Sequence, residues 1–314
     1  MGRISALTIV AMTLFLAIAS AQQSPPSEGE DQTITVDVDL VNVLFSVRDK
    51  KGGLYTGMAE EDLRVYEDGK LQTITNFSSE TDLPLTVALL VDTSGSIRDK
   101  LRFEQEAAIE FFFSTIRRRK DQGMLVAFDS GVDLLQDFTD NAETLADAVR
   151  KIRAGGGTSL YDAIYLAIGE KVATKSGRKV VIVISDGDDN ASKISMTETL
   201  EMAQKNDVAV YTISTNSTAN FGTKEQRRGD RTLKTFAEET GGRAFFPFKL
   251  QELAVSFADI SQELRSQYTM AYIPTNRARD GSFRKIEVKP TKKGYKVKAR
   301  KGYYAPRASL QEQY

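Results

Sequence analysis

The chain has 314 residues, a net charge of −1, and no histidine, cysteine or tryptophan. Without histidine, a Ser-His-Asp triad, a histidine general base and a histidine-ligated zinc site are excluded. Without cysteine, thiol nucleophiles, disulfides and iron–sulfur clusters are excluded. The near balance of charge gives no indication of binding to nucleic acid or to a membrane surface. A metal site here must be built from carboxylates, hydroxyls, carbonyls and water.

The N-terminus has the pattern of an export signal. Arg3 supplies a positive charge, residues 4–18 are mostly apolar, and residues 19–21 form a small-residue cleavage site. The apolar stretch is short for a membrane span and no stop-transfer pattern follows, which favours cleavage over an uncleaved anchor. Residues 22–31 are polar and contain two prolines, which predicts a disordered spacer. We expect a signal peptide at residues 1–21 and a periplasmic or extracellular protein.

Residues 32–80 have the spacing of strands. Apolar and polar residues alternate from Thr33 to Leu40, the period of a half-buried strand. Further strands are expected at Val43–Val47, Leu63–Tyr66 and Leu71–Phe77, separated by turns at residues 49–53 and 67–69.

Residues 83–267 change to alternating strands and helices. Strands are expected at Leu85–Asp92, Met124–Asp129, Val132–Phe138, Lys179–Ser185, Val208–Ser214 and Arg243–Phe248. Helices are expected at Ile97–Arg119, Ala142–Arg153, Leu160–Val172, Met196–Asn206, Arg231–Glu239 and Leu250–Arg265. Continuously apolar runs such as Val180–Ile184 indicate burial on both faces. This pattern predicts an α/β domain with a doubly wound, mostly parallel, Rossmann-like sheet.

After Gln267 the helical period stops. Three more strands are expected at Tyr268–Ile273, Phe283–Val288 and Tyr295–Ala299, and residues 306–314 are expected to form a tail. The two β-rich flanks are each too small for a separate core. We therefore predict that residues 32–80 and 268–305 pack together as one small, discontinuous β-sandwich-like domain around the inserted α/β domain.

Oxygen-bearing side chains follow three of these strands or loops. Asp92-Thr93-Ser94-Gly95-Ser96 ends the first apolar strand, Thr158 stands in a glycine-rich loop, and Asp186 follows the apolar run to Ser185. Ligands of open α/β sheets bind at the carboxyl ends of the strands. Hydroxyls and carboxylates are the hard donors that Mg²⁺ prefers. The pattern predicts a divalent-cation site.

Each piece also has an ordinary interpretation. Ser96 with Asp99, and Ser159 with Asp162, have the spacing of helix capping boxes. The glycine-rich loop and the residues after Asp186 could be simple turns. The occurrence of all the pieces, in order and at one sheet edge, favours the metal site. Asp188 could tune the charge of that site, although a solvated loop acid is the simpler interpretation.

The polar, basic stretch from Thr215 to Arg231 is expected to be a mobile loop. It contains Arg228-Gly229-Asp230, a tripeptide recognised by some integrins. We interpret this as a chance match in which Asp230 caps the next helix.

The Asp-x-Ser-x-Ser segment with Thr158 and Asp186 resembles the metal-ion-dependent adhesion site of von Willebrand factor type A domains. The resemblance covers residues 83–267. The flanks are similar to a bacterial group of secreted "VWFA-related domain" proteins. That wider similarity lies in Val47–Gly52, Val65–Gly69 and Arg300–Tyr304.

The resemblance implies a role for each matching residue. The hydroxyls of Ser94, Ser96 and Thr158 would ligate the cation, while Asp92 and Asp186 would act directly or through water. Mg²⁺ is the expected ion, with Mn²⁺ or Ca²⁺ possible. Neutral hydroxyls leave its charge incompletely neutralised, so an Asp or Glu carboxylate of a protein partner can take an open position. Four neighbouring residues are expected to contribute to ligand binding: Thr93, Gly157, Ser159 and Asp188.

Three functions fit a cation site at this edge. The first is a secreted, non-enzymatic adhesion or interaction module that captures an acidic side chain. The second is a Mg²⁺-dependent phosphoester hydrolase, which is disfavoured because Ser94 replaces the second aspartate of an aspartyl-phosphate enzyme and the motif loops hold no basic clamp. The third is a structural envelope subunit assembled through the β domain, in which the metal site would be vestigial; the intact set of five residues argues against it.

Overall fold

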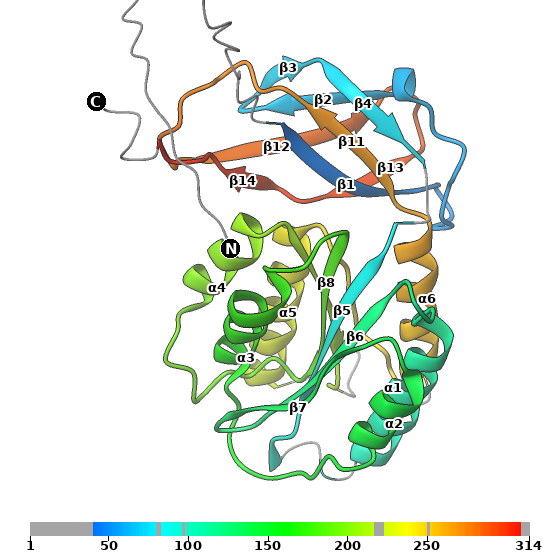
Figure 1. Ribbon diagram of the computed structural model, residues 1–314, viewed down its shortest axis with the longest axis vertical. Coiled ribbons are helices and arrows are strands. Elements are labelled where there is room, and N and C mark those ends of the chain that lie inside the picture. Colours follow the sequence, from blue (N-terminus) through cyan, green and yellow to red (C-terminus); the bar gives the residue numbers. More distant parts are fainter. Residues whose placement is uncertain are drawn as a thin grey trace, which may run out of the picture. The chain divides into compact units, whose positions relative to one another are not determined.

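The computed structural model describes residues 40–79, 83–95, 98, 100–216, 223–249 and 252–308. The predicted signal peptide and spacer lie outside the described residues, as do Ser96 and most of the strand predicted at Thr33–Leu40. Three sheets form in the described chain, one of six strands and two of four (Figure 1).

The six-stranded sheet is built from the central part of the sequence. Its order is β10-β9-β8-β5-β6-β7, with β5 paired to β6 on one side and to β8 on the other. The pairs are parallel except for β6 with β7, which form an antiparallel edge. The prediction of a mostly parallel sheet is therefore confirmed. The strands are β5 (Leu85–Asp92), β6 (Gln122–Phe128), β7 (Val132–Thr139), β8 (Arg178–Ser185), β9 (Val208–Ser214) and β10 (Ala244–Phe245).

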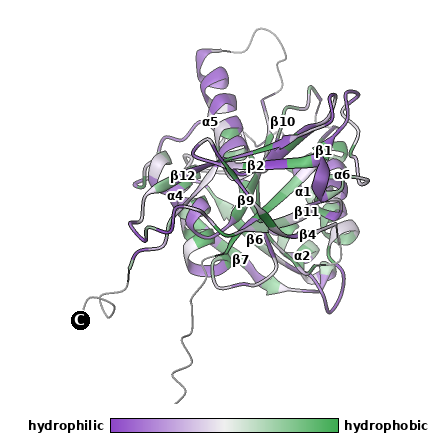
Figure 2. Cartoon of the chain, turned by 90° about the horizontal axis from the view of Figure 1, so that it is seen from above, coloured by the Kyte–Doolittle hydropathy of each residue, from purple (hydrophilic) through white to green (hydrophobic). Residues whose placement is uncertain are grey.

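Helices cover both faces of this sheet (Figure 1). One face packs against α1 (Leu101–Thr115), α2 (Ala142–Val149) and α6 (Glu252–Arg265). The other packs against α3 (Leu160–Leu166), its π-helical continuation η3 (Ala167–Val172), α4 (Met196–Lys205) and α5 (Lys224–Thr240). Every residue of β5 is buried, so its mostly apolar side chains pack against both helix layers. Seen from above, hydrophobic residues line the strands between the helices, and α5 is mainly hydrophilic (Figure 2).

Helix α5 begins earlier than the sequence spacing predicted. The Thr223 hydroxyl accepts from the Gln226 amide at 3.3 Å, and the Gln226 side chain accepts from the Thr223 amide at 2.9 Å. This capping box starts the helix at Lys224. The prediction of a loop continuing to Arg231 was therefore wrong. None of the helices in the described ranges is both long and apolar enough to cross a membrane.

Strands from the two ends of the chain form one β region. One antiparallel sheet has the order β13-β1-β11-β4 and the other β14-β12-β2-β3. Their shared core includes Phe45, Val65, Tyr268 and Ile286. The predicted joining of the two β-rich flanks is confirmed. The strands are β1 (Val41–Arg48), β2 (Leu63–Glu67), β3 (Lys70–Gln72), β4 (Ile74–Ser78), β11 (Tyr268–Tyr272), β12 (Phe283–Pro290), β13 (Lys296–Ala299) and β14 (Gly302–Tyr304), and a 3-10 turn at Glu60–Asp62 precedes β2.

Two details of the β region differ from the prediction. The single strand expected at Leu71–Phe77 is divided at Thr73 into β3 and β4, which belong to different sheets. Strand β14 was not predicted. In the first sheet β4 pairs with β11, so that Ser78 faces Thr269. The chain therefore leaves the β region and returns to it at neighbouring strands.

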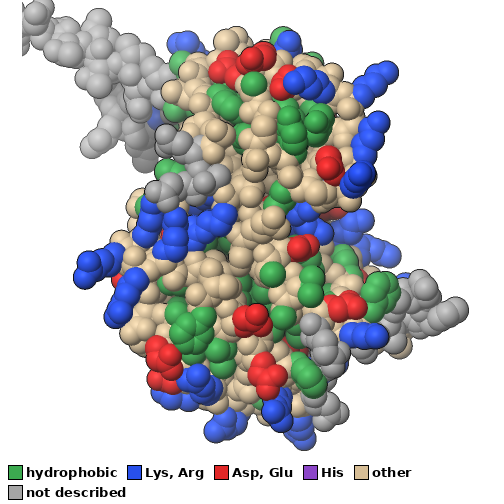
Figure 3. Space-filling view, turned by 90° about the vertical axis from the view of Figure 1, so that its right-hand side faces the viewer, with side chains coloured by type: hydrophobic (Ala, Val, Ile, Leu, Met, Phe, Trp, Pro, Cys, Tyr) green, Lys and Arg blue, Asp and Glu red, His purple; other side chains and the backbone are tan. Residues whose placement is uncertain are grey.

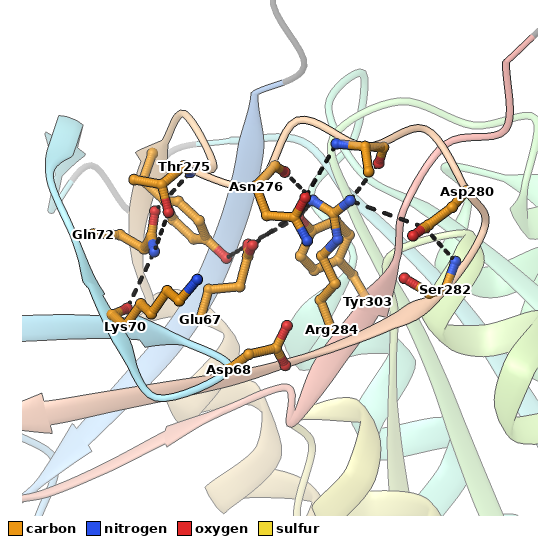
Figure 4. Close-up of polar contacts among 12 residues, drawn as sticks. Glu67, Asp68, Lys70, Gln72, Thr275, Asn276, Asp280, Ser282, Arg284 and Tyr303 are labelled. Atoms are coloured by element: carbon orange, nitrogen blue, oxygen red, sulfur yellow. Dashed lines mark hydrogen bonds and ion pairs between the residues drawn. The ribbon is translucent and has the colours of Figure 1, made fainter.

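A buried ion pair lies inside the β region (Figure 4). Arg284 and Glu67 are each about 2% exposed, with Nη1 and Oε1 3.7 Å apart. The hydroxyls of Tyr272 and Tyr303 both donate to Glu67 Oε2 at 2.9 Å. Arg284 also donates to the carbonyls of Asn276 and Ala278, in the loop before β12. Each charge in this cluster therefore has several partners within the protein.

A second buried acid joins α6 to the β region. Glu263 is fully buried; it accepts from the Ser46 hydroxyl at 3.1 Å and forms an ion pair with Arg48 at 2.5 Å. Ser46 and Arg48 belong to β1. Because α6 leads directly into β11, this contact fixes the last helix of the α/β region against the sheet that it enters.

Candidate metal centre

The predicted site residues lie where the strand order of the six-stranded sheet reverses. The chain passes from β5 to β6 in one direction, and returns to place β8 on the other side of β5. Asp92 is the last residue of β5, and Asp186 follows the last residue of β8. The crevice outside the carboxyl ends of two such strands is the usual ligand site of a doubly wound sheet.

Asp92 is the most deeply buried acid of the site. Its Oδ2 atom accepts from the Ser185 hydroxyl at 2.6 Å and its Oδ1 atom from the Ser94 amide at 2.9 Å. Burial raises the pKa of Asp92 to about 6, although these hydrogen bonds oppose the shift, and the nearby Asp186 carboxylate adds to it. A nearby cation would favour the ionised form and offset this penalty.

Backbone hydrogen bonds join the glycine-rich loop to the loop after β5. The Gly155 amide donates to the Thr93 carbonyl at 2.7 Å, and the Gly95 amide donates to the Gly156 carbonyl at 3.2 Å. Thr158, two residues after Gly156, is buried. The two loops predicted to share a cation are therefore in direct contact.

The same glycine-rich loop is joined to the loop after β8. The Thr158 amide donates to the Asn190 side chain at 3.0 Å, and the Asn190 and Ala191 amides both donate to the Thr158 carbonyl at 3.0 Å. Asp186 stands earlier in that loop, half-buried, and accepts from the Asp188 amide at 3.1 Å. Loops from three distant parts of the sequence thus meet at this edge.

Helix α5 supports the Asp186 loop through the tripeptide that the sequence left without a role. At Gly229 the helix approaches so closely that a Cβ atom would lie 2.1 Å from the Asp186 carbonyl oxygen. Arg228 pairs with Asp188. Asp230 accepts from the Ser214 hydroxyl at 2.7 Å and from the Asn216 side chain at 2.9 Å.

Asn216 in turn donates to the Asp186 carbonyl at 3.0 Å. The prediction that Asp230 caps the next helix was wrong, because Asp230 lies inside α5. The Arg228-Gly229-Asp230 segment instead packs against the loop that carries Asp186 and holds it in position.

The remaining predicted residues have varied surroundings. The buried Thr93 hydroxyl donates to the Phe128 carbonyl at 3.0 Å, and the Gly157 amide donates to the Ser130 hydroxyl at 2.7 Å. Ser94 is buried beside Asp92. The Ser159 hydroxyl is buried and has no hydrogen-bond partner among the described residues. Ser159 therefore does not cap α3 with its side chain, as the ordinary interpretation required.

Glu104 was missed by the sequence reasoning. It lies in the first turn of α1, is about 1% exposed, and neither of its carboxylate oxygens has a hydrogen-bond partner in the described chain. Its pKa is raised to about 8, mainly by burial and also by the charges of Asp92 and Asp186, while the charge of Lys100 opposes the shift. The available signal was an acid placed on the helix face that continues through Ala108 and Phe111, both buried.

The residues present fit a hard divalent cation. Their side-chain donors are oxygens, and the buried Ser159 and Glu104 oxygens lack protein partners, which is rare unless water or an ion satisfies them. Across the described ranges, no group of three or more acidic side chains is gathered closely enough to hold a metal alone. Hydroxyls such as those of Ser94 and Thr158 would therefore have to complete the coordination, as the sequence predicted.

Comparisons with known proteins agree with this fold. The sequence model of the von Willebrand factor type A domain matches residues 87–188. The human von Willebrand factor A domain-containing protein 3A is 27% identical, over 62% of this chain and 16% of the human protein. This chain thus corresponds to only a small part of that relative.

Two solved structures share the architecture. A von Willebrand factor type A protein from Catenulispora acidiphila superposes with a TM-score of 0.50 at 12% identity, covering 88% of this chain and 75% of that one. Proximal thread matrix protein 1 from the mussel byssus gives a TM-score of 0.50 at 16% identity, covering 72% and 50%. Identities this low support the fold alone.

The family-model match assigns residues 87–188 to a von Willebrand factor type A domain, and the doubly wound sheet agrees with that assignment. The chain contains a von Willebrand factor type A domain, combined with antiparallel sheets formed by the segments on either side of it. Domains of this class are in general protein-interaction and adhesion modules.

Proposed function

We propose that this protein is an exported, cation-dependent interaction module that captures an acidic side chain of a protein partner. Asp92, Ser94, Ser96, Thr158 and Asp186 would hold the cation, with Mg²⁺ expected. The main support is the meeting of three loops around the buried Asp92 carboxylate at the switch point of the sheet. Export rests on the sequence pattern of residues 1–21.

The chemistry of the donors supports capture of a carboxylate. Hydroxyl ligands carry no charge, so a cation held mainly by them keeps an attraction for an outside anion. Ser94 and Thr158 are buried and held in place, Ser94 through its amide to Asp92 and Thr158 through both its amide and its carbonyl. The backbone that carries these hydroxyls therefore needs little reordering when a cation binds, which favours affinity.

The surface charge is consistent with a protein partner. Acidic and basic side chains both occur across the face shown in Figure 3, and the net charge of the whole chain is −1. Nucleic-acid binding depends on an excess of basic side chains on one face. We therefore expect recognition to depend on the local metal site.

Cation binding is the first measurement. Mg²⁺ and Mn²⁺ are titrated by calorimetry into the wild-type protein and into Asp92→Ala. A matched control is Asp147→Ala, which removes an exposed acid from α2. We expect the wild type and the control to bind one cation and Asp92→Ala to bind none. Equal binding by Asp92→Ala would refute the proposed site.

Partner capture is the second measurement. The three proteins are used as bait for an envelope fraction of the source organism, with Mg²⁺ or with EDTA, and captured proteins are identified by mass spectrometry. A partner held by the wild type and by Asp147→Ala, and released by EDTA, supports the proposal. Capture that EDTA does not affect would favour structural assembly through the β region. Mg²⁺-dependent turnover of generic phosphoesters, lost in Asp92→Ala, would favour the hydrolase alternative.

A further inference from the structure

Glu104 is a buried acid that the proposed ligand set leaves without a role. Its side chain is enclosed by the protein, yet both carboxylate oxygens lack a hydrogen-bond partner among the residues that the structure describes. A buried carboxylate without donors is strongly unfavourable, so the few that occur call for an explanation such as a functional role or a bound ion or water.

The surroundings of Glu104 link it to the cation site. It stands at the start of α1, which follows the Asp92 loop in sequence, and the charges of Asp92 and Asp186 both act on it. Lys100 is the neighbouring cation, but its Nζ atom donates to the Thr215 carbonyl at 2.6 Å, beyond the end of β9. The cation whose charge acts on Glu104 is therefore itself bound to a backbone carbonyl.

Two buried hydroxyls near the carboxyl edge of the sheet also lack hydrogen-bond partners in the described chain. Thr215 Oγ1 and Ser159 Oγ are both buried without a partner in the described ranges. Thr215 follows β9 and donates its amide to the Ser185 carbonyl, next to Asp186. Unpaired hydroxyls and an unpaired carboxylate around one edge indicate an interior that binds ordered water.

Glu104 is not placed to act as a primary ligand. Asp92, Asp186 and Glu104 do not form a close group of three acids that could hold a metal directly. Water is the natural connection between a carboxylate outside the ligand set and a hydrated cation, because Mg²⁺ keeps several of its waters when bound to protein.

We propose that Glu104 is an outer carboxylate of the cation site, which accepts hydrogen bonds from cation-bound water and adds a third negative charge to the centre. The inference rests on the proposed function of the same site. Its consequence is a balance between two affinities. A third carboxylate strengthens cation binding, and it weakens the attraction of the bound cation for a partner's carboxylate.

The test compares matched substitutions on one helix. Glu104→Gln keeps the volume of the side chain and removes its charge, whereas Glu106→Gln changes an exposed acid two residues away. Mn²⁺ is titrated by calorimetry into the wild type, both variants, and Asp92→Ala. We expect Glu104→Gln to weaken Mn²⁺ binding about 10-fold or more, within the range known for groups that orient metal ligands, and Glu106→Gln to leave it unchanged.

Two further readouts separate this role from a structural one. The melting temperature of metal-free Glu104→Gln should equal or exceed that of the wild type, which shows that weaker Mn²⁺ binding does not come from unfolding. With Mn²⁺ saturating, acetate should bind Glu104→Gln more tightly than the wild type, because the cation is less neutralised.

The outcomes distinguish failure of this inference from failure of the proposed function. If the wild type binds Mn²⁺, Asp92→Ala does not, and Glu104→Gln matches the wild type in both Mn²⁺ and acetate affinity, the role of Glu104 is refuted and the metal site stands. If the wild type binds no Mn²⁺, the metal site itself is refuted, and the role of Glu104 with it.

Discussion

The β region and the α/β region each bury a glutamate, but the two carboxylates differ in their partners. Glu67 has an arginine and two tyrosine hydroxyls around it, and is part of a cluster that also holds the loop before β12. Glu104 has no hydrogen-bond partner within the described chain. A buried carboxylate with charged and hydrogen-bonding partners is tolerated in a fold, whereas one left unpaired lowers stability and indicates a role toward something outside the chain.

The largest expected effect on stability comes from removing the positive charge of the Glu67 cluster. Arg284→Met leaves Glu67 buried without its positive partner and frees two loop carbonyls, so we expect the free energy of unfolding to fall by about 3–5 kcal/mol. Urea denaturation measures it. Lys285→Met, at the next position of β12 with an exposed side chain, serves as the control and should change stability by less than about 0.5 kcal/mol. Similar losses in both variants would contradict this account of the cluster.

The next largest effect is the stabilisation of the fold by Mg²⁺ at the Asp92 site. Mg²⁺ at about 100 times its dissociation constant should raise the free energy of unfolding by about 2.7 kcal/mol. Asp92→Ala should abolish the increase, while Arg284→Met should keep it if the variant still folds. Thermal unfolding with Mg²⁺ or EDTA provides the measurement. An equal increase in Asp92→Ala would mean that Mg²⁺ acts elsewhere.

Replacing the buried glutamate by glutamine should change the free energy of unfolding in opposite directions in the two regions. Because folding raises the pKa of Glu104 from 4.5 to about 8, the folded protein retains a proton that the unfolded chain releases between these values. Glu104 therefore lowers stability increasingly as pH rises through this interval, and the full penalty is present above pH 8. We expect Glu104→Gln to stabilise the metal-free protein by about 1–3 kcal/mol at pH 8, and to have little effect near pH 4.5.

Glu67→Gln should instead destabilise by about 1–3 kcal/mol, since an amide cannot replace the carboxylate beside Arg284. Urea denaturation of both variants at the two pH values tests the pair. A stability of Glu104→Gln that is below that of the wild type at pH 8 would show that the Glu104 carboxylate is satisfied after all.

The smallest expected loss of stability comes from an exposed arginine–carboxylate pair, in contrast to the buried pair of Arg284 and Glu67. The Arg228 and Asp188 side chains are 65% and 33% exposed, so Arg228→Ala should cost at most about 1 kcal/mol, against the larger loss for Arg284→Met. The substitution should also leave the Asp188 charge unpaired beside the metal loop. Chemical denaturation, repeated in 1 M NaCl, checks the exposed character of the pair, since salt should abolish the difference between Arg228→Ala and the wild type.

The sequence predicted the strands of the central sheet best. The bounds of β5 and β9 agree with the prediction because each is an apolar run that ends at a polar residue on leaving the core. Helix α5 was shortened in the prediction, since its N-terminal half is polar and little of it faces the core. The Thr223–Gln226 capping box was the available signal. The division between β3 and β4 arises because each half joins a different sheet. This is decided by tertiary packing, and the local alternation of apolar and polar residues does not predict it.

The candidate site was predictable in part. The three loops could be placed at one edge because parallel strands of a doubly wound sheet share that edge. The role of Gly229 could not be inferred, since it depends on the packing of α5 against the Asp186 loop. Glu104 was hidden for a related reason: an acid near a helix start is ordinarily a solvated dipole partner, and only burial distinguishes it.

The pairing of β4 with β11 indicates where the α/β region could be excised from the chain. Ser78 faces Thr269, so the two chain crossings that carry the α/β region are neighbours in one sheet. A short artificial hairpin could join β4 to β11 and leave the eight-stranded remainder continuous, while the excised segment would keep its own sheet and both helix layers. The α/β region could therefore be exchanged between related proteins at this one junction, provided that the buried Glu263 of α6 again meets partners such as Ser46 and Arg48.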